Sequence, residues 1–211
     1  YILGPEVEAF EAEFASFTGA QYAAGVANGT DAIELALLAA GVGPGDYVAT
    51  VSHTAVATLS AIRRMGASPL FVDIDPDFFT MSLDSLAEVM ALKNIKAIIV
   101  VHIYGQMAEI HQILSLAQKE NIIVIEDCAQ AHGAKIGSQM AGSIGDIGCF
   151  SFYPTKNLGA LGDGGALVTS NASYAKKIKS LRQYGWEERY ISSIQGINSR
   201  LDEMQAAILR V

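Results

Sequence analysis

Short apolar runs alternate with amphipathic helical patterns over residues 5–127, and this alternation constrains the fold more than any other feature. Strand-like runs lie at residues 68–75 and 121–127, while residues 82–93 and 108–120 repeat apolar side chains with the helical period. Apolar strands that are separated by helices predict parallel pairing and a sheet covered on both faces. We therefore expect an α/β domain in which a mainly parallel sheet lies between two layers of helices.

The sequence also predicts where particular elements begin and end. Pro5 suits the first turn of a helix, and Ser82 suits an N-cap. We further expect a helix over residues 53–66 and a strand over residues 95–105. From Gly133 the strands shorten and glycines become frequent, which in an α/β protein often marks the functional site. Ligands of such sheets bind beyond the carboxyl ends of the strands, so the site is expected there.

Composition narrows the class of protein. The chain has 211 residues, of which 51% are hydrophobic and 17% charged, so it can bury one substantial core. Its net charge of -8 argues against a nucleic-acid partner, and no apolar run is long enough to cross a bilayer. Cys128 and Cys149 form no C-x-x-C pair, which indicates buried thiols in a reducing compartment. A reducing compartment agrees with a cytoplasmic protein, which is the location we expect.

The stretch ANGTDAIELAL combines the end of a strand, a turn and the start of a helix. Asn28, Gly29 and Thr30 lie where the free backbone N–H groups of the helix point outward. A helix N-terminus with a small residue and a hydroxyl is a natural phosphate site. Asn28 or Thr30 could equally be an ordinary helix cap.

The stretch IIVIEDCAQAHGA places two carboxylates at the end of the most apolar strand, where a charged group needs a cation or a donor. Asp127 beside a protonated heterocyclic nitrogen would keep that proton in place, and Gln130 could donate to an oxygen on the same ring. The plainer alternative is a strand-end aspartate bonded to backbone amides. A metal site is not expected, because none of the histidines, His132 included, has a second ligand at a recognisable spacing.

The stretch FSFYPTKNLGALGDGG carries a lysine, Lys156, ahead of four glycines. Lysine is normally a surface residue, whereas glycine at this density indicates that the backbone closely approaches something. A solvated lysine at the tip of a hairpin is the plainer interpretation. With Ser151 five residues earlier, the stretch also fits a cofactor that carries a phosphate and an aldehyde. A phosphate site, a ring carboxylate and a lysine amine are the parts that pyridoxal 5'-phosphate (PLP) needs.

Together these motifs resemble the DegT/DnrJ/EryC1/StrS family of PLP-dependent aminotransferases, which aminate nucleotide-linked keto-sugars. The resemblance covers essentially the whole chain through NGTDAIELALLAAGVGPGD, HTAVAT, GASPLFVDID, VHIYGQ, IEDCAQAHGA, GDIGCFSFYPTKNLGALGDGGA and GINSRLDEMQAAIL. It implies that residues 1–211 form the large domain of a fold type I PLP enzyme, a three-layer α/β/α sandwich. It also implies a smaller C-terminal domain that this chain lacks, which agrees with a helical pattern that stops uncapped at residue 211.

The resemblance implies a role for each matching position. Lys156 matches the lysine that bonds to the cofactor aldehyde, and Asp127 matches the partner of the pyridine nitrogen, so these two are the expected catalytic residues. The expected cofactor-binding residues are Gly29, Thr30, Asp127, Gln130, Ser151, Lys156 and Asn198. Asn198 matches an asparagine that reaches the cofactor phosphate of the neighbouring subunit, which implies a homodimer with shared active sites. A local turn residue is the plainer interpretation of Asn198.

The implied reaction moves an amino group from a donor, glutamate in most relatives, to a nucleotide-linked keto-sugar by a PLP/PMP ping-pong mechanism. The motifs look most like those of enzymes that act on a dTDP-3-keto-6-deoxyhexose, with 4-keto UDP- or GDP-sugar enzymes as the alternative. Related sugar dehydratases carry histidine in place of Lys156, so the lysine favours transamination. Many relatives place an aromatic residue on the cofactor ring where this chain has Ala55, and His53 could compensate or cap the next helix.

Two alternatives of other kinds stay open at this point. A PLP-binding regulator of the same family would lack transaminase activity, but the complete set of cofactor residues favours an enzyme. A nucleotide-binding α/β domain without PLP would leave Lys156 and Asp127 unexplained. Binding of PLP by the protein separates this last alternative from the others.

Overall fold

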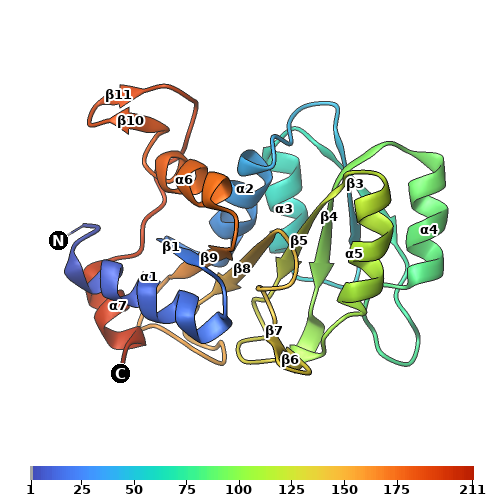
Figure 1. Cartoon of the computed structure of the whole chain (residues 1–211), viewed down its shortest axis with the longest axis horizontal. Coiled ribbons are helices and arrows are strands. Elements are labelled where there is room, and N and C mark those ends of the chain that lie inside the picture. The colour runs from blue at the N-terminus through green and yellow to red at the C-terminus, as the bar shows by residue number, and fades with distance from the viewer. Residues whose placement is uncertain (1) are drawn as a thin grey trace.

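A seven-stranded sheet forms the centre of the computed structural model, which describes residues 2–211 (Figure 1). Its strands lie in the order β1-β9-β8-β5-β4-β2-β3. They are β1 (Tyr22–Val26), β2 (Tyr47–Val51), β3 (Ser68–Val72), β4 (Ile95–Val101), β5 (Ile123–Asp127), β8 (Ile147–Ser151) and β9 (Gly165–Thr169). The positions of the first five strands along the chain follow the apolar runs of the sequence.

The sheet is parallel except at β9, which pairs antiparallel with both β8 and β1. A parallel connection needs a crossover, usually a helix, whereas β8 and β9 are joined by a loop that turns back directly. The regular alternation of the sequence breaks after Gly133 because the structure describes no helix between β5 and β8 or between β8 and β9. The expected fold class, an α/β sandwich with a mainly parallel sheet, is confirmed.

Helices cover both faces of the sheet (Figure 1). One layer holds α2 (Gly29–Ala39), α3 (Val56–Arg64) and α6 (Ala172–Leu181). The other holds α1 (Pro5–Thr18), α4 (Leu83–Leu92), α5 (Ile110–Lys119) and α7 (Glu203–Leu209). Successive side chains of a strand point to opposite faces of the sheet. Ile125 therefore packs against the first helix layer and Val124 against the second.

The predicted element boundaries are partly confirmed. Pro5 begins α1, and the Ser82 hydroxyl caps α4 by accepting from the Ser85 amide at 3.3 Å. The helix predicted over 53–66 is wrong at its start, because residues 52–54 form a turn and α3 begins only at Val56. The strand predicted over 95–105 is wrong at its end.

The shorter strand has a structural reason. Val101 is the last residue of β4 because it pairs with Asp127, the last residue of its neighbour β5. The chain then makes a short 3-10 turn (η1, Ile103–Gly105), in which Tyr104 has a positive φ of 58°. This turn carries residues of the predicted strand across the carboxyl edge of the sheet.

Two small hairpins complete the described part of the chain. One consists of β6 (Lys135–Ile136) and β7 (Gln139–Met140), and the other of β10 (Trp186–Glu188) and β11 (Ile191–Ser192). The second hairpin projects beyond α6, away from the central sheet (Figure 1). Cys128 and Cys149 are buried and unpaired, as predicted. Within residues 2–211, no helix combines the length and apolarity that crossing a membrane requires.

Candidate active site

The predicted site residues gather at the carboxyl edge of the parallel strands. The turn that contains Gly29 follows β1, Asp127 ends β5, and Ser151 ends β8. Along β5 and β8 the side chains alternate, which turns Asp127 and Ser151 toward the layer of α2 and α3. The fold therefore brings three distant segments of the sequence to one place.

The turn at Gly29 packs directly on the end of β8. A Cβ atom added to Gly29 would lie 2.6 Å from the Ser151 Cβ and 3.2 Å from its hydroxyl oxygen. An added Cβ on Gly165, the partner of Ser151 in β9, would lie 2.5 Å from the backbone carbonyl of Asn28. Glycine is required at both positions because the turn and the strands approach so closely.

The cap of α2 leaves backbone donors free at this turn. The side-chain Oδ1 of Asn28 accepts from the Asp31 amide at 2.8 Å, and the backbone carbonyl of Asn28 accepts from the Ala32 amide at 3.1 Å. Asn28 is thus the helix cap, and Thr30 is not. Because a helix has no internal acceptors for its first N–H groups, those of Gly29 and Thr30 can still bind an anion.

Asp127 is a buried carboxylate held by neutral donors. Its Oδ2 accepts from the Thr58 hydroxyl at 2.9 Å, and its Oδ1 accepts from the Ala129 amide at 3.2 Å. Burial raises the pKa of Asp127 above its ordinary value, although these hydrogen bonds and the charge of Lys156 act against the rise. The plain interpretation, an aspartate bonded to a backbone amide, is therefore correct in part and leaves the charge largely uncompensated.

Lys156 and Gln130 lie on separate loops, which follow β8 and β5. Lys156 is half-buried in the turn after β8, where its amide donates to the Tyr153 carbonyl at 2.8 Å. Its positive charge opposes the rise in the pKa of Asp127. Gln130 is exposed in the turn that follows β5.

Asn198 differs from Asp127 and Ser151 in being exposed. Its side chain is exposed and makes no hydrogen bond to any of residues 2–211. The next residue, Ser199, accepts from the Ala27 amide at 3.0 Å and donates to Asp31 at 2.7 Å. These two hydrogen bonds hold the segment of Asn198 beside the start of α2 in its own chain.

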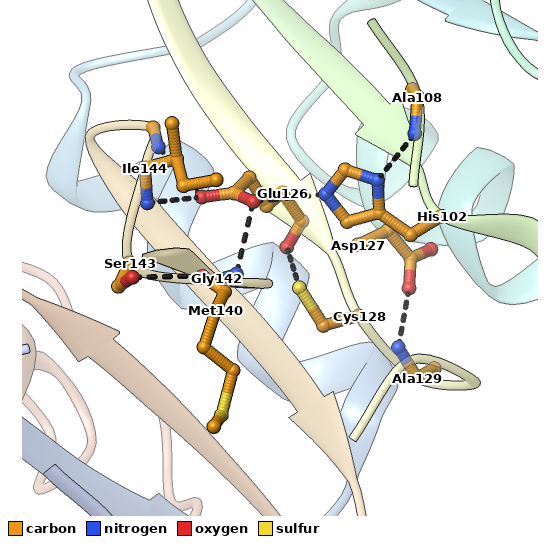
Figure 2. Close-up of polar contacts among 11 residues, drawn as sticks. His102, Ala108, Glu126, Asp127, Cys128, Ala129, Met140, Gly142, Ser143 and Ile144 are labelled. Carbon is orange, nitrogen blue, oxygen red and sulfur yellow. Dashed lines mark hydrogen bonds and ion pairs between the residues drawn. The ribbon is translucent and has the colours of Figure 1, made fainter. Parts of the chain in front are cut away.

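A second buried network lies on the opposite face of the sheet, and the sequence did not predict it (Figure 2). Glu126 accepts from the backbone amides of Gly142, Ile144 and Gly145 at 2.6 to 2.9 Å, and it bonds His102 Nε2 at 2.9 Å. Although burial acts to raise it, these hydrogen bonds lower the pKa of Glu126 below its ordinary value. The network ties the end of β5 to the turn that precedes β8.

The tautomer of His102 follows from its partners. The Ala108 amide donates to Nδ1 at 3.1 Å, so Nδ1 carries no proton and Nε2–H donates to Glu126. The Cys128 thiol lies near both side chains and donates to the Glu126 carbonyl at 3.8 Å (Figure 2). These contacts make the three residues a hydrogen-bonded structural cluster.

The chain matches known proteins over its whole length. The model of the DegT/DnrJ/EryC1/StrS aminotransferase family covers residues 1–211. The chain is 50% identical over 210 residues to "UDP-N-acetyl-3-dehydro-alpha-D-glucosamine 3-aminotranferase" of Acidithiobacillus ferrooxidans, covering 100% of this chain and 57% of that protein. It is also 50% identical over 212 residues to a dTDP-3-amino-3,6-dideoxy-alpha-D-galactopyranose transaminase of Aneurinibacillus thermoaerophilus, covering 100% and 58%.

A solved structure of an aminotransferase also matches the fold of this chain. The crystal structure of S. venezuelae DesV matches with a TM-score of 0.96 and 42% identity, over 99% of this chain and 56% of that one. The chain therefore spans a little over half the length of the relatives it matches. By the match of its full sequence and of its fold, the chain belongs to the DegT/DnrJ/EryC1/StrS aminotransferase family.

Proposed function

We propose that this chain is the cofactor-binding large domain of a PLP-dependent aminotransferase that acts on a nucleotide-linked keto-sugar. Aminotransferases of this family use PLP. The observation that carries the proposal is the convergence of Gly29, Asp127, Ser151 and Lys156 at the carboxyl edge of the sheet. The residues at this edge suit each part of the cofactor in turn.

The turn after β1 suits the phosphate. The free N–H groups of Gly29 and Thr30 and the nearby Ser151 hydroxyl supply donors at the positive end of α2. A side chain at residue 29 would fill this cradle, because its Cβ would meet Ser151. We infer that these three residues hold the phosphate.

Asp127 suits the ring nitrogen. Its two oxygens accept from neutral donors, and its burial favours the protonated form. A cationic ring nitrogen beside it would offset that desolvation, and the ionised carboxylate would in turn keep the ring nitrogen protonated. Gln130, in the turn just after Asp127, is our candidate for the ring hydroxyl.

Lys156 supplies the amine that the chemistry requires. When bound, PLP acts as an electron sink for the bond that is broken at the amino donor. Lys156 would hold the cofactor by its side-chain nitrogen between turnovers and, once released, would take the proton from Cα of the donor. Lys156 follows β8 and its positive charge opposes the rise in the pKa of Asp127, which supports a base on the same side of the sheet as the ring partner.

The names of the relatives favour amination at C3 of the sugar. The two relatives described above are named for 3-amino or 3-dehydro sugars, one linked to UDP and the other to dTDP. We retain a dTDP-3-keto-6-deoxyhexose as the substrate and glutamate as the donor, and a 4-keto UDP- or GDP-sugar is the alternative. We also propose a homodimer in which Asn198, exposed in this chain, reaches the partner's cofactor.

Spectroscopy of the full-length protein tests this proposal. Protein loaded with PLP should show a visible band that bleaches when glutamate is added, and the pyridoxamine form should then aminate a keto-sugar. Panels of 3-keto and 4-keto sugars on dTDP, UDP and GDP would identify the substrate by mass and NMR of the product. A band that no amino donor bleaches would contradict the transaminase assignment.

A further inference from the structure

Thr58 is a buried side chain that touches the candidate site and has no assigned role. We infer that Thr58 is a positioning residue for Asp127, and that its hydroxyl fixes the carboxylate that faces the cofactor ring. This inference rests on the proposed function, because it concerns how Asp127 meets the ring nitrogen. The role explains why a buried position carries a hydroxyl group.

Two hydrogen bonds fix the orientation of the Asp127 carboxylate plane. Thr58 is 0% exposed, and its Oγ1 lies 2.9 Å from Asp127 Oδ2, while the Ala129 amide lies 3.2 Å from Oδ1. One donor on each oxygen holds the carboxylate plane from two sides. Each oxygen can accept more than one hydrogen bond, so the carboxylate retains capacity for a ring N–H.

The direction of the hydrogen bonds follows from the charge of Asp127. An ionised carboxylate has no proton to give, so Thr58 must donate to it. The Thr58 oxygen is then free to accept, and Thr54 Oγ1 lies 2.8 Å away. The chain of donors therefore runs from Thr54 through Thr58 to Asp127, and each bond in such a chain strengthens the next.

The start of α3 explains why the two threonines meet. The helix begins at Val56, so Thr58 lies in its first turn, and Thr54 lies just before the helix. The N-terminal end of α3 carries the positive end of the helix dipole, which also favours a negative charge at Asp127.

Electrostatics support the same role. Burial raises the pKa of Asp127, and among the groups that oppose this rise the Thr58 hydroxyl acts most strongly, ahead of Ala129, His102 and Lys156. Other titratable groups nearby are the thiols Cys128 and Cys149, whose own pKa values burial raises well above the ordinary value, and Glu126, which faces the opposite side of the sheet. Without the hydroxyl, Asp127 would be protonated more readily and would be a weaker partner for the ring nitrogen.

The test compares Thr58→Val, which removes the hydroxyl at nearly constant shape, with Thr58→Ser, which keeps it. The matched control is Thr50→Val, since Thr50 is also 0% exposed and donates to a carbonyl, that of Ile99, at 3.1 Å. Full-length protein loaded with PLP provides two readouts: the dissociation constant for PLP and the pH midpoint of the visible band. The midpoint reports the charge on the ring, which a purely structural change would leave in place.

Thr58→Val should weaken PLP binding on the order of tenfold and raise the pH midpoint, because a less positive ring makes the proton at the Lys156 nitrogen harder to lose. Thr58→Ser should stay within about twofold of the parent protein. Thr50→Val should leave the midpoint unchanged. In an Asp127→Asn background, Thr58→Val should have no further effect on the midpoint, because its influence passes through the carboxylate.

The outcomes separate this inference from the proposed function. If borohydride reduction fails to attach PLP to Lys156 in the parent protein, the proposed function is wrong. If PLP is attached and Thr58→Val behaves like Thr50→Val, the role of Thr58 is refuted. A shift of the midpoint that is equal in the parent protein and in the Asp127→Asn background would refute it as well.

Discussion

Gly29 packs on Ser151 so tightly that a Cβ atom at residue 29 would lie 2.6 Å from the Ser151 Cβ, although the two residues come from opposite halves of the chain. This contact joins the N-terminus of α2 to the end of β8, and it forms the proposed phosphate site. The proximity of these two segments is the geometric basis of the cofactor proposal.

Gly29→Ala should weaken PLP binding by at least about tenfold, because the added methyl group pushes Ser151 or the turn out of place. The dissociation constant measured by titration of the visible band checks this. Gly43→Ala is the control, because no atom lies within 4 Å of a Cβ added there, and its affinity should equal that of the parent. Unchanged affinity in Gly29→Ala would contradict the assignment of this turn to the phosphate.

Asp127→Asn should stabilise the protein without cofactor while lowering activity on the order of a hundredfold. Because burial raises the pKa of Asp127, the folded state binds this proton more tightly than the unfolded chain does. Stability is therefore lost as pH rises above about 4, the usual carboxyl pKa. The variant lacks this loss, so its Tm should exceed that of the parent at pH 7 by a few degrees.

Thermal melts of both cofactor-free proteins across the pH range check this prediction. The difference in Tm should shrink as the pH falls toward about 4, where the carboxyl group is protonated in both states. Parallel curves for the two proteins at all pH values would show that Asp127 carries no uncompensated charge.

Glu126→Gln should lower the free energy of unfolding by roughly 3 kcal/mol, because the amide group turns a donor toward buried N–H groups. Chemical denaturation at neutral pH measures this change. The hydrogen bonds that lower the pKa of Glu126 contribute stability above the ordinary carboxyl pKa, and this stability is lost as the pH falls through the lower folded value. Glu120→Gln, at an exposed carboxylate, should change the free energy of unfolding by less than about 0.5 kcal/mol.

His132 should make the protein acid-sensitive. Its ring packs beside Phe150 and Phe152, with centroid distances of 5.4 and 5.8 Å, and burial lowers its pKa to about 4. As the pH falls below the ordinary value of 6.5, the unfolded chain takes up a proton that the folded state does not, so stability is lost. His132→Gln should lose less Tm between pH 7 and pH 5 than the parent does.

The control for this experiment is His111→Gln, at an exposed histidine on α5, which should retain the slope of the parent. A slope for His132→Gln that matches the parent would show that His132 does not titrate in this way.

The sequence predicts most of the fold because its helical and strand periods are long and regular. It also places Asp127 and Ser151 at one edge of the sheet, since parallel strands end on the same side. The contacts of these residues could not be predicted in the same way. Thr58 meets Asp127 from 69 residues away, and such a tertiary contact leaves no mark in the periodicity of the sequence.

The network of Glu126 shows the same limit. The sequence marks Glu126 as a carboxylate at the end of an apolar strand, but the alternation of the strand turns it to the face opposite Asp127. Its partners come from the segment after β4 and from the turn before β8. A buried glutamate directly before the predicted ring partner is the signal that could have suggested a supporting network.

Lys156 is the residue on which the account depends most, and borohydride reduction tests it directly. The full-length protein would be incubated with PLP, reduced, digested and analysed by mass spectrometry, with Lys156→Ala as the matched variant. The cofactor mass should lie on the peptide that contains Lys156, and the variant should retain its fold but have no transaminase activity. A label on another lysine, or full activity in the Lys156→Ala variant, would show that Lys156 is not the residue that bonds to the cofactor.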